Sequence, residues 1–437
     1  MVMKKRIFAL VMVLALSISM LAACGGGGGG ESSDEGGDIT LTFLDKHPEE
    51  EYKGYFEQAI ADFEAANPGV HIEYENISDQ AIKEKLAVLA SGGDMPDIFF
   101  AWGGESLNRF SRNGKCLDLT PYFEADPEWR DSFLPMFLSS SVLDGKNYAV
   151  PYRSSVLYML YNKKVLEDNG IKVPETWDEF MAACEKLKGA GVAPIAFGNS
   201  DQWYAMWYIG QFNSSFVDKA VRDKDYNPAS SEFTDPGYEA AVQTFLDLNS
   251  KGYMGTNVNS KDYYQVREEF AVGQYGFMLD ATSQFSFYTE AMGPEGYGYF
   301  KIPIPTGANG DEANDIVTGG SENWAVSSTC EHPDEAVAFL KFMTARDQAI
   351  KQTQETGLPN ALIGGITEDT TDDPVIVAAY KTAEDYSAIA EWFDQCVDAN
   401  ISNAYMANAQ EGLDGKDIKE IMAAVQAAAK ETVEANQ

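Results

Sequence analysis

The chain has 437 residues, which is long for one compact domain and predicts two domains or one two-lobed unit. Hydrophobic residues make up 45% of it and aromatic residues 12%, enough to bury a sizeable core and to exclude a disordered chain. Its 32 basic residues stand against 68 acidic ones. Such a surface is repelled by phosphate backbones, which argues against nucleic acid as a partner.

The first residues have the pattern of a bacterial lipoprotein signal. A basic segment (residues 1–6) precedes an apolar run (7–20) that is too short for a transmembrane span and typical of a secretory signal. The letters LAAC, ending at Cys24, resemble a lipobox, in which the cysteine is acylated and becomes the new N-terminus. The alternative is a plain secretory signal with an incidental cysteine. We predict a signal peptide over residues 1–23 and lipidation at Cys24, on the extracellular face of the cell membrane.

Residues 24–37 are rich in glycine, serine and acidic residues and predict a flexible tether. A Gly-rich chain of this length has a root-mean-square reach of roughly 20 Å. A two-chain acyl anchor is enough for stable membrane attachment. The rest of the protein is therefore expected to be soluble in character but held at a membrane.

Nothing in the sequence predicts a metal or a cofactor. The three histidines form no HExxH motif and no pair at helical spacing, and the acidic stretch 368–373 lacks the calcium-loop pattern. The remaining cysteines are far apart and contain no CxxC, so we predict buried free thiols. They are Cys116, Cys184, Cys330 and Cys396.

From residue 38 onward, short apolar strands alternate with amphipathic helices. The expected order is a strand over 39–43, a helix over 52–66, a strand over 70–74, a helix over 80–90 and a buried strand over 97–100. This βαβαβ order is typical of an α/β fold in which helices flank an open sheet.

The pattern continues with a strand over 156–161 and a helix over 177–188. Thr176 and Glu179 have the spacing of a capping box at the start of that helix. No period repeats along the chain, which excludes solenoids and propellers. The remaining expected elements are helices over 237–248, 332–346 and 417–433 and a strand over 275–279.

Several segments, in this order along the chain, resemble family-1 extracellular solute-binding proteins of ABC importers, the group that includes the maltose-binding protein. Each motif is short and weak by itself, but together they span nearly the whole mature chain behind a lipobox. The matching segments are MPDIF (95–99), VPYRSSVLYMLYNKKVL (150–166) with VPETWDEF (173–180), GQYGFMLD (273–280), GGSENWAVS (319–327) and EGLDGKD (411–417).

The resemblance implies a type II periplasmic-binding-protein fold, in which two α/β lobes are joined by hinge strands. It implies a ligand in the cleft between the lobes, hinge closure around it, and delivery by a monomer to the permease subunits of an ABC importer. We place the crossings between lobes near residues 150–153, 306–318 and 356–360. The expected lobes are residues 38–152 with 314–358 and residues 153–313 with 359–437.

A carbohydrate cleft needs aromatic rings interleaved with polar side chains. Trp102 follows a strand at its carboxyl end, where ligands bind in open α/β sheets, although a packing role is equally open. Trp203 matches a family position that holds a stacking aromatic. Trp324 and Trp392 are further candidates. Four residues after Trp203 on the same helix, Trp207 is expected in the core. Trp177 is expected to be structural, and Trp129 is expected either at the surface or in packing.

The polar candidates surround the same segments. Arg153 lies in an otherwise apolar strand and needs a partner if it is buried, either a carboxylate such as Asp280 or the hydroxyls of the ligand. The family often places a tryptophan shortly after the Asp280 position, but this chain offers Ser283 or Phe285 there. His47 is either a ligand contact or a solvated loop residue. The full polar set is Lys46, His47, Arg153, Ser155, Asp280, Ser283 and Glu322.

The sequence therefore predicts a lipid-anchored protein that binds a carbohydrate, with an oligosaccharide favoured by the number of aromatic residues. The alternatives are a binding protein for another solute, a surface glycoside hydrolase, which needs two carboxylates flanking a bond, or an adhesin. No acidic pair stands out by its position, so we expect a non-enzymatic protein.

Overall fold

The computed structural model describes residues 38–436 except 47–49, 311–315, 384–385 and 387. The expected signal peptide, the lipidated Cys24, the tether and His47 lie outside the described residues. Within the described part, no helix combines the length and the apolar composition needed to cross a bilayer.

A nine-stranded mixed sheet organises the described chain, with strand order β2-β1-β3-β10-β6-β8-β7, β11 beside β10 and β9 beside β6. A separate two-stranded ribbon is formed by β4 and β5. The strands are β1 (Ile39–Asp45), β2 (Val70–Asn76), β3 (Ile98–Trp102), β4 (Val142–Leu143), β5 (Lys146–Asn147), β6 (Val150–Asn162), β7 (Ala193–Ala196), β8 (Tyr275–Ala281), β9 (Tyr297–Phe300), β10 (Ile316–Val326) and β11 (Ala388–Glu391).

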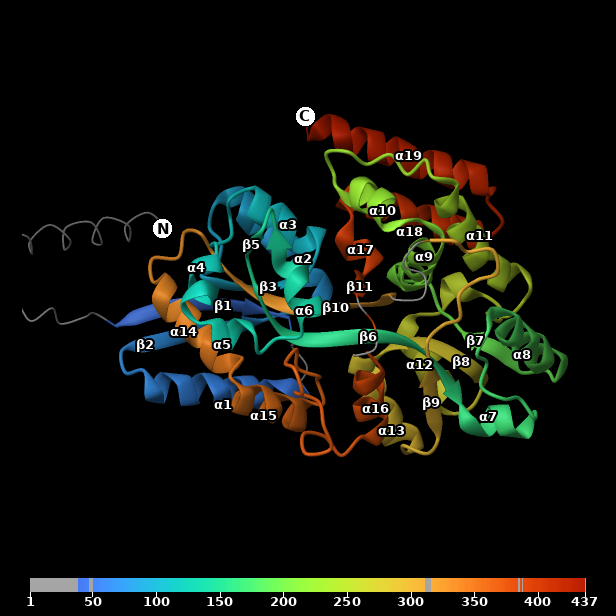
Figure 1. Cartoon of the computed structure of the whole chain (residues 1–437), viewed down its shortest axis with the longest axis horizontal. Helices are drawn as coiled ribbons and strands as arrows, with labels where there is room; N and C mark the ends of the chain where they lie inside the picture. Colours follow the sequence, from blue (N-terminus) through green and yellow to red (C-terminus); the bar gives the residue numbers. More distant parts are fainter. Residues whose placement is uncertain (1–37, 47–49, 311–315, 384–385, 387, 437) are drawn as a thin grey trace, which may run out of the picture. The chain divides into compact units, whose positions relative to one another are not determined.

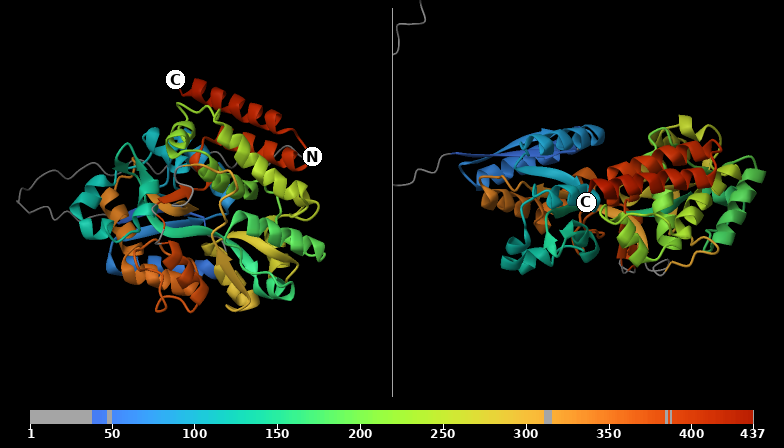
Figure 2. Two further views of the ribbon diagram at one scale, coloured as in Figure 1. Left: turned by 45° about the vertical axis from the view of Figure 1, so that its right-hand side comes forward. Right: turned by 90° about the horizontal axis from the view of Figure 1, so that it is seen from above.

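The long strand β6 belongs to both halves of this sheet. Its first part pairs antiparallel with β10, from Val150 opposite Trp324 to Val156 opposite Gly319. Its second part pairs with β8 and β9. Figure 1 shows β6 running from the elements around β1 and β3 to those around β8 and β9, and Figure 2 shows these two groups from other sides. The chain therefore has two α/β lobes, as expected, and the continuous strand β6 belongs to both of them.

Helices cover the sheet in both halves: α1 packs on α14 and α15, α8 on β7, and α9 on α11. The helices are α1 (Glu50–Ala66), α2 (Asp79–Gly92), α3 (Glu105–Arg112), α4 (Thr120–Ala125), α5 (Pro127–Arg130), α6 (Pro135–Leu138), α7 (Lys163–Asp168), α8 (Trp177–Gly189), α9 (Trp203–Phe216), α10 (Lys219–Tyr226), α11 (Pro236–Ser250), α12 (Tyr263–Ala271), α13 (Phe285–Met292), α14 (Pro333–Met343), α15 (Arg346–Thr356), α16 (Pro374–Ala383), α17 (Phe393–Cys396), α18 (Ala399–Leu413) and α19 (Ile418–Ala435). Three 3₁₀ turns span Ser139–Ser141, Val258–Ser260 and Thr282–Gln284.

The expected βαβαβ order is confirmed as β1-α1-β2-α2-β3, because β1 pairs in parallel with both β2 and β3. The capping box is also confirmed: Thr176 Oγ1 accepts from Glu179 N, and the Glu179 carboxylate accepts from Thr176 N. The four described cysteines are unpaired, as predicted, but only Cys116 and Cys184 are buried, whereas Cys330 and Cys396 are half-buried.

The helix expected over residues 332–346 is confirmed as α14, but it ends three residues early, at Met343. The chain breaks there into α14 and α15, because Ala345 is extended (φ −59°, ψ 145°). Thr344 Oγ1 donates to Leu340 O at 2.7 Å and accepts from Trp129 Nε1 at 3.0 Å. These contacts hold the end of α14, and the propensity pattern alone does not reveal them.

Candidate ligand-binding site

The carboxyl end of β3, the middle of β6 and β10, and the start of α9 border one cavity of about 460 Å³. Residues from both halves of the sheet line it. They are Lys46, Lys83, Trp102, Arg153, Ser154, Ser155, Asp201, Trp203, Trp207, Tyr263, Tyr264, Ala281, Ser283, Gln284, Gly320, Glu322, Trp392, Asp394 and Gln395.

Three tryptophans and a tyrosine form an aromatic wall on one side of this cavity. The ring of Trp203 lies 5.1 Å from that of Trp207 and 5.0 Å from that of Tyr263. Trp207 in turn stacks on Trp392, with ring centroids 5.1 Å apart and an interplanar angle of 26°. Aromatic rings next to polar groups suit the C–H faces and hydroxyls of a sugar. We call Trp203, Trp207, Tyr263 and Trp392 the aromatic wall.

Close backbone approaches hold the aromatic wall in place. A Cβ on Gly320 would lie 2.5 Å from Trp392 Nε1, so only glycine lets that indole pack against β10. A Cβ on Gly198 would lie 2.7 Å from Asp262 O, which holds the loop before α9 against the start of α12. Gln202, immediately before α9, adopts φ +63°, a left-handed conformation uncommon for a non-glycine residue. Such backbone outliers cluster at binding sites.

Trp102 lies at the end of β3, and two lysines flank its ring. Lys46 Nζ is 5.2 Å and Lys83 Nζ 4.7 Å from the ring centroid, within the range of cation–π attraction. Lys46 comes directly after β1 and Lys83 from α2, so this part of the cavity depends on the parallel βαβαβ unit. Trp102 is 8% exposed, and it therefore both packs in the core and contributes to the cavity lining.

A carboxylate on β10 links this region to the long strand. Glu322 lies opposite Arg153 in the β10–β6 pairing, just before a β-bulge. Its oxygens accept from Lys46 Nζ at 2.8 Å, from Arg153 at 2.9 Å and from the Tyr152 hydroxyl at 3.2 Å. Burial lowers the pKa of the Arg153 guanidinium, but Glu322 and the neighbouring tyrosines, Tyr152 first among them, together outweigh burial, and the net pKa lies above its usual value. Arg153 therefore remains charged.

Eight of the eleven expected site residues line the cavity: Lys46, Trp102, Arg153, Ser155, Trp203, Ser283, Glu322 and Trp392. Of the two alternatives after Asp280, Ser283 lines the cavity and Phe285 is fully buried. The expected partner of Arg153 was Asp280 or the ligand, but its ion-pair partner is Glu322.

Trp324 does not line the cavity, contrary to expectation. It is fully buried, stacks on Tyr152 at 3.8 Å and packs edge-on against Phe43. Its Nε1 donates to Asp45 Oδ1 at 3.3 Å. Trp324 lies two residues after Glu322, on the other side of the β-bulge, and pairs with Val150 of β6. Its indole N–H therefore has a partner in the core, Asp45, and does not face the cavity.

Asp280 is also fully buried and does not line the cavity. The Tyr263 hydroxyl donates to it at 2.8 and 2.9 Å, and the Tyr288 hydroxyl also donates to it. Burial raises the pKa of Asp280 to about 6, opposed by these hydrogen bonds. Because Tyr263 belongs to the aromatic wall, Asp280 acts on the cavity by orienting that tyrosine rather than by direct contact.

Several lining residues were missed by the sequence reasoning. Trp207 was expected in the core but lines the cavity, and its i, i+4 spacing from Trp203 was the signal for a shared face. Lys83 lies on a helix face that reads as ordinary solvated surface. Tyr263 and Tyr264 begin α12, and nothing in the sequence places that helix start beside α9.

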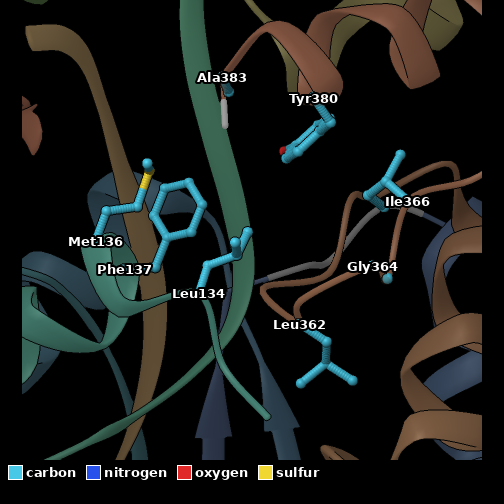
Figure 3. A pocket seen from close by; sticks show the side chains of 9 residues that line it. Leu134, Met136, Phe137, Leu362, Gly364, Ile366, Tyr380 and Ala383 are labelled. Carbon is cyan, nitrogen blue, oxygen red and sulfur yellow. The ribbon is translucent and has the colours of Figure 1, made fainter. Parts of the chain in front are cut away.

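A second cavity, of about 20 Å³, lies beside β6 and is mainly apolar (Figure 3). Tyr380 points its ring into it from α16, facing Phe137. The Tyr380 hydroxyl already donates to Ser154 O at 2.9 Å. The volume and the few polar groups make this cavity a poorer candidate for a polar solute than the first.

Comparison with known proteins agrees with the fold. The family described as "Bacterial extracellular solute-binding protein" matches residues 47–350. A Brucella abortus protein described only as a binding protein is 29% identical over 340 residues, 75% of this chain and 76% of that protein. The diacetylchitobiose binding protein of Streptomyces coelicolor is 26% identical over 371 residues, 82% of this chain and 81% of that protein.

Among solved structures, a chitin oligosaccharide binding protein has a TM-score of 0.78 at 24% identity, covering 91% of this chain and 100% of that chain. The fold is therefore the two-lobed type II fold of periplasmic binding proteins. With its family match over most of the sequence, this chain belongs to the bacterial extracellular solute-binding protein family.

Proposed function

We propose that this protein captures an oligosaccharide in the large cavity and delivers it to an ABC importer. The observation that carries the proposal is the aromatic wall, which faces a cavity also lined by Arg153, Ser155 and Glu322. Ligand pockets for drug-sized molecules usually measure about 300–1000 Å³, and a cavity of about 460 Å³ has room for a small oligosaccharide.

The names of related proteins support carbohydrate as the ligand class. Relatives are named as binding diacetylchitobiose and as a multiple sugar-binding protein, and a structural neighbour as binding chitin oligosaccharide. At identities of 24–26% these names support a class and not one sugar.

Isothermal titration with a panel of di- to tetrasaccharides, including chitin oligosaccharides, tests the proposal. We expect micromolar or tighter binding to at least one member. Binding to a peptide or a polyamine, with no sugar bound at that level, would overturn it. Release of label from a reducing-end-labelled oligosaccharide would instead favour a glycoside hydrolase.

The proposal includes a lipid anchor at Cys24 and a tether over residues 24–37, supported by the lipobox-like LAAC sequence. Cells expressing the full chain should incorporate labelled palmitate into it, and Cys24→Ser should abolish the labelling and release the protein from the membrane. Cys330→Ser is the matched control and should leave both unchanged. Unchanged labelling in the Cys24 variant would contradict the anchor.

A further inference from the structure

A second group of residues that line the cavity is rich in cations. We call Lys46, Lys83, Trp102, Arg153 and Ser155 the cationic wall. Lys83 Nζ lies 4.7 Å above the Trp102 ring, and no carboxylate of the described chain forms an ion pair with it. An ammonium group without an anionic partner beside a cavity is available to an anion brought by a ligand.

Arg153 contributes a second unmet donor. Its side chain is 8% exposed, and one of its terminal nitrogens is taken by Glu322. Its Nε is buried and has no hydrogen-bond acceptor among the described residues. Ser155, two residues along β6, has a buried hydroxyl without a described partner as well. Buried donors normally have partners, so a ligand acceptor at this point would complete the site.

Acceptors are scarce on this wall. Glu322 is the carboxylate that adjoins it, and Lys46, Arg153 and Tyr152 already donate to its oxygens. A neutral sugar presents hydroxyls that both donate and accept, whereas a carboxylate only accepts. Donors without matching acceptors therefore favour a carboxylate. The carboxylates of Asp201 and Asp394 line the cavity within two residues of Trp203 and Trp392, where neutral hydroxyls would find acceptors.

The acidity of the whole chain does not forbid an anionic ligand. The formal net charge is −36, but at physiological ionic strength the Debye length is about 8 Å. Distant surface carboxylates are therefore screened, while Lys83 and Arg153 act at contact distance.

We propose that the cationic wall binds a carboxylate-bearing sugar, a uronate, at one end of the oligosaccharide, while the aromatic wall holds its neutral sugars. The proposal rests on the proposed function and narrows its substrate class. Lys83 is the specificity-determining residue, because it is the cation of this wall without an ion-pair partner in the described chain. Charge-assisted hydrogen bonds are roughly twice as strong as neutral ones, which makes the discrimination measurable.

The test compares each ligand with itself after removal of the charge. Trigalacturonate, a glucuronoxylo-oligosaccharide and a hyaluronan tetrasaccharide are titrated by calorimetry beside their carboxyl-reduced forms, which keep the linkages. We expect at least one acidic form to bind at least tenfold tighter than its reduced form, with a preference that declines as salt is raised.

Lys83→Met should lower the affinity for the acidic form about tenfold and leave that for the reduced form within about twofold. Lys85→Met is the matched control. It lies on the same helix, pairs with Glu75 and does not line the cavity, so it should change neither affinity. Thermal unfolding of both variants checks that they are folded.

Equal or tighter binding of every reduced form would overturn the uronate inference and leave the proposed function standing. A preference for the acidic form that survives in Lys83→Met would overturn the role of Lys83. Binding of neither acidic nor neutral oligosaccharides would overturn both the inference and the proposed function.

Discussion

Trp203 and Trp207 lie on successive turns of α9, and both contribute to the cavity lining. The sequence suggested a division in which Trp203 meets the ligand and Trp207 packs in the core. The structure replaces that division, because Trp207 stacks on Trp392 within the same aromatic wall. The residues that take the core positions of α9 are instead Tyr204 and Tyr208, both fully buried.

We therefore predict that Trp203→Ala and Trp207→Ala behave alike in sugar binding. Each removes a ring from the centre of the site, where a tryptophan is worth about 2 kcal/mol or more. Affinity should fall about 30-fold in either variant, measured by titration with the best-bound sugar of the panel. Trp177→Ala is the control, since Trp177 packs on Phe180 and Phe212 away from the cavity. If Trp207→Ala keeps its affinity for the sugar, Trp207 packs in the core and only Trp203 contacts the ligand.

Glu391 provides a prediction about pH. It ends β11 between Gly103 and Gly320, and both carboxylate oxygens are buried beside the Ser140 hydroxyl. Burial raises the pKa of Glu391 from 4.5 to about 8. The folded state therefore holds this proton more tightly than the unfolded state. Its contribution to stability is fully present below pH 4.5 and is lost as the pH rises toward and through 8.

Glu391→Gln keeps the shape but cannot ionise. We expect its free energy of unfolding, measured by urea titration, to fall less between pH 5 and pH 9 than that of the unaltered protein. Glu295→Gln, at an exposed site, is the control and should follow the unaltered protein. If the stability of Glu391→Gln depends on pH in the same way as that of the unaltered protein, the pKa of Glu391 is the same in the folded and unfolded states, and the prediction is wrong.

Individual elements owe their ends to local chemistry that can be read in the sequence. The helix α8 begins at the capping box of Thr176 and Glu179, which satisfies two backbone donors that the first turn leaves unpaired. The break between α14 and α15 has no such local signal. It depends on the contact of Thr344 with Trp129, which is 215 residues away in sequence.

Loss of the α8 cap should therefore affect stability but not binding. We expect Thr176→Ala to lower the free energy of unfolding by about 1 kcal/mol, the usual value for a helix N-cap. Glu179→Gln should cost much less, because glutamine also completes a capping box. Urea denaturation gives the stabilities, and sugar titration should show unchanged affinity. A change in affinity would mean that α8 is coupled to the cavity.

The whole molecule is organised around β6 and β10, which carry Arg153, Ser155 and Glu322 at the crossing between lobes. We propose that residues 38–152 with 314–358 and residues 153–313 with 359–437 close as two rigid bodies around the ligand. Periplasmic binding proteins are known to close around their ligands by a hinge motion of this kind.

The expected result is a smaller radius of gyration by small-angle X-ray scattering when the best-bound sugar is added to the protein. A ligand that contacts both lobes would bind the closed form more tightly and shift the population toward it. Trp203→Ala at the same sugar concentration serves as the unliganded control. An unchanged radius with saturating sugar would contradict closure and favour a surface protein with a static site.

The sequence by itself determined the elements that depend on neighbouring residues: the βαβαβ start, the capping box of α8 and the buried run that became β6. Eight of the eleven residues that it predicted for the site line the cavity. Local periodicity and capping act over a few residues, so they are visible in one dimension.

Only the tertiary structure decided which side chains share the cavity. Trp324 follows Glu322 by two residues, yet the β-bulge and the core around Phe43 bury it. In the sequence, Lys83 has the pattern of a solvent-exposed helix residue. In the structure, the position of α2 places its ammonium group above the Trp102 ring. The physical reason is that burial and charge pairing depend on residues far apart in sequence, and their positions are set when the strands pair and the helices pack.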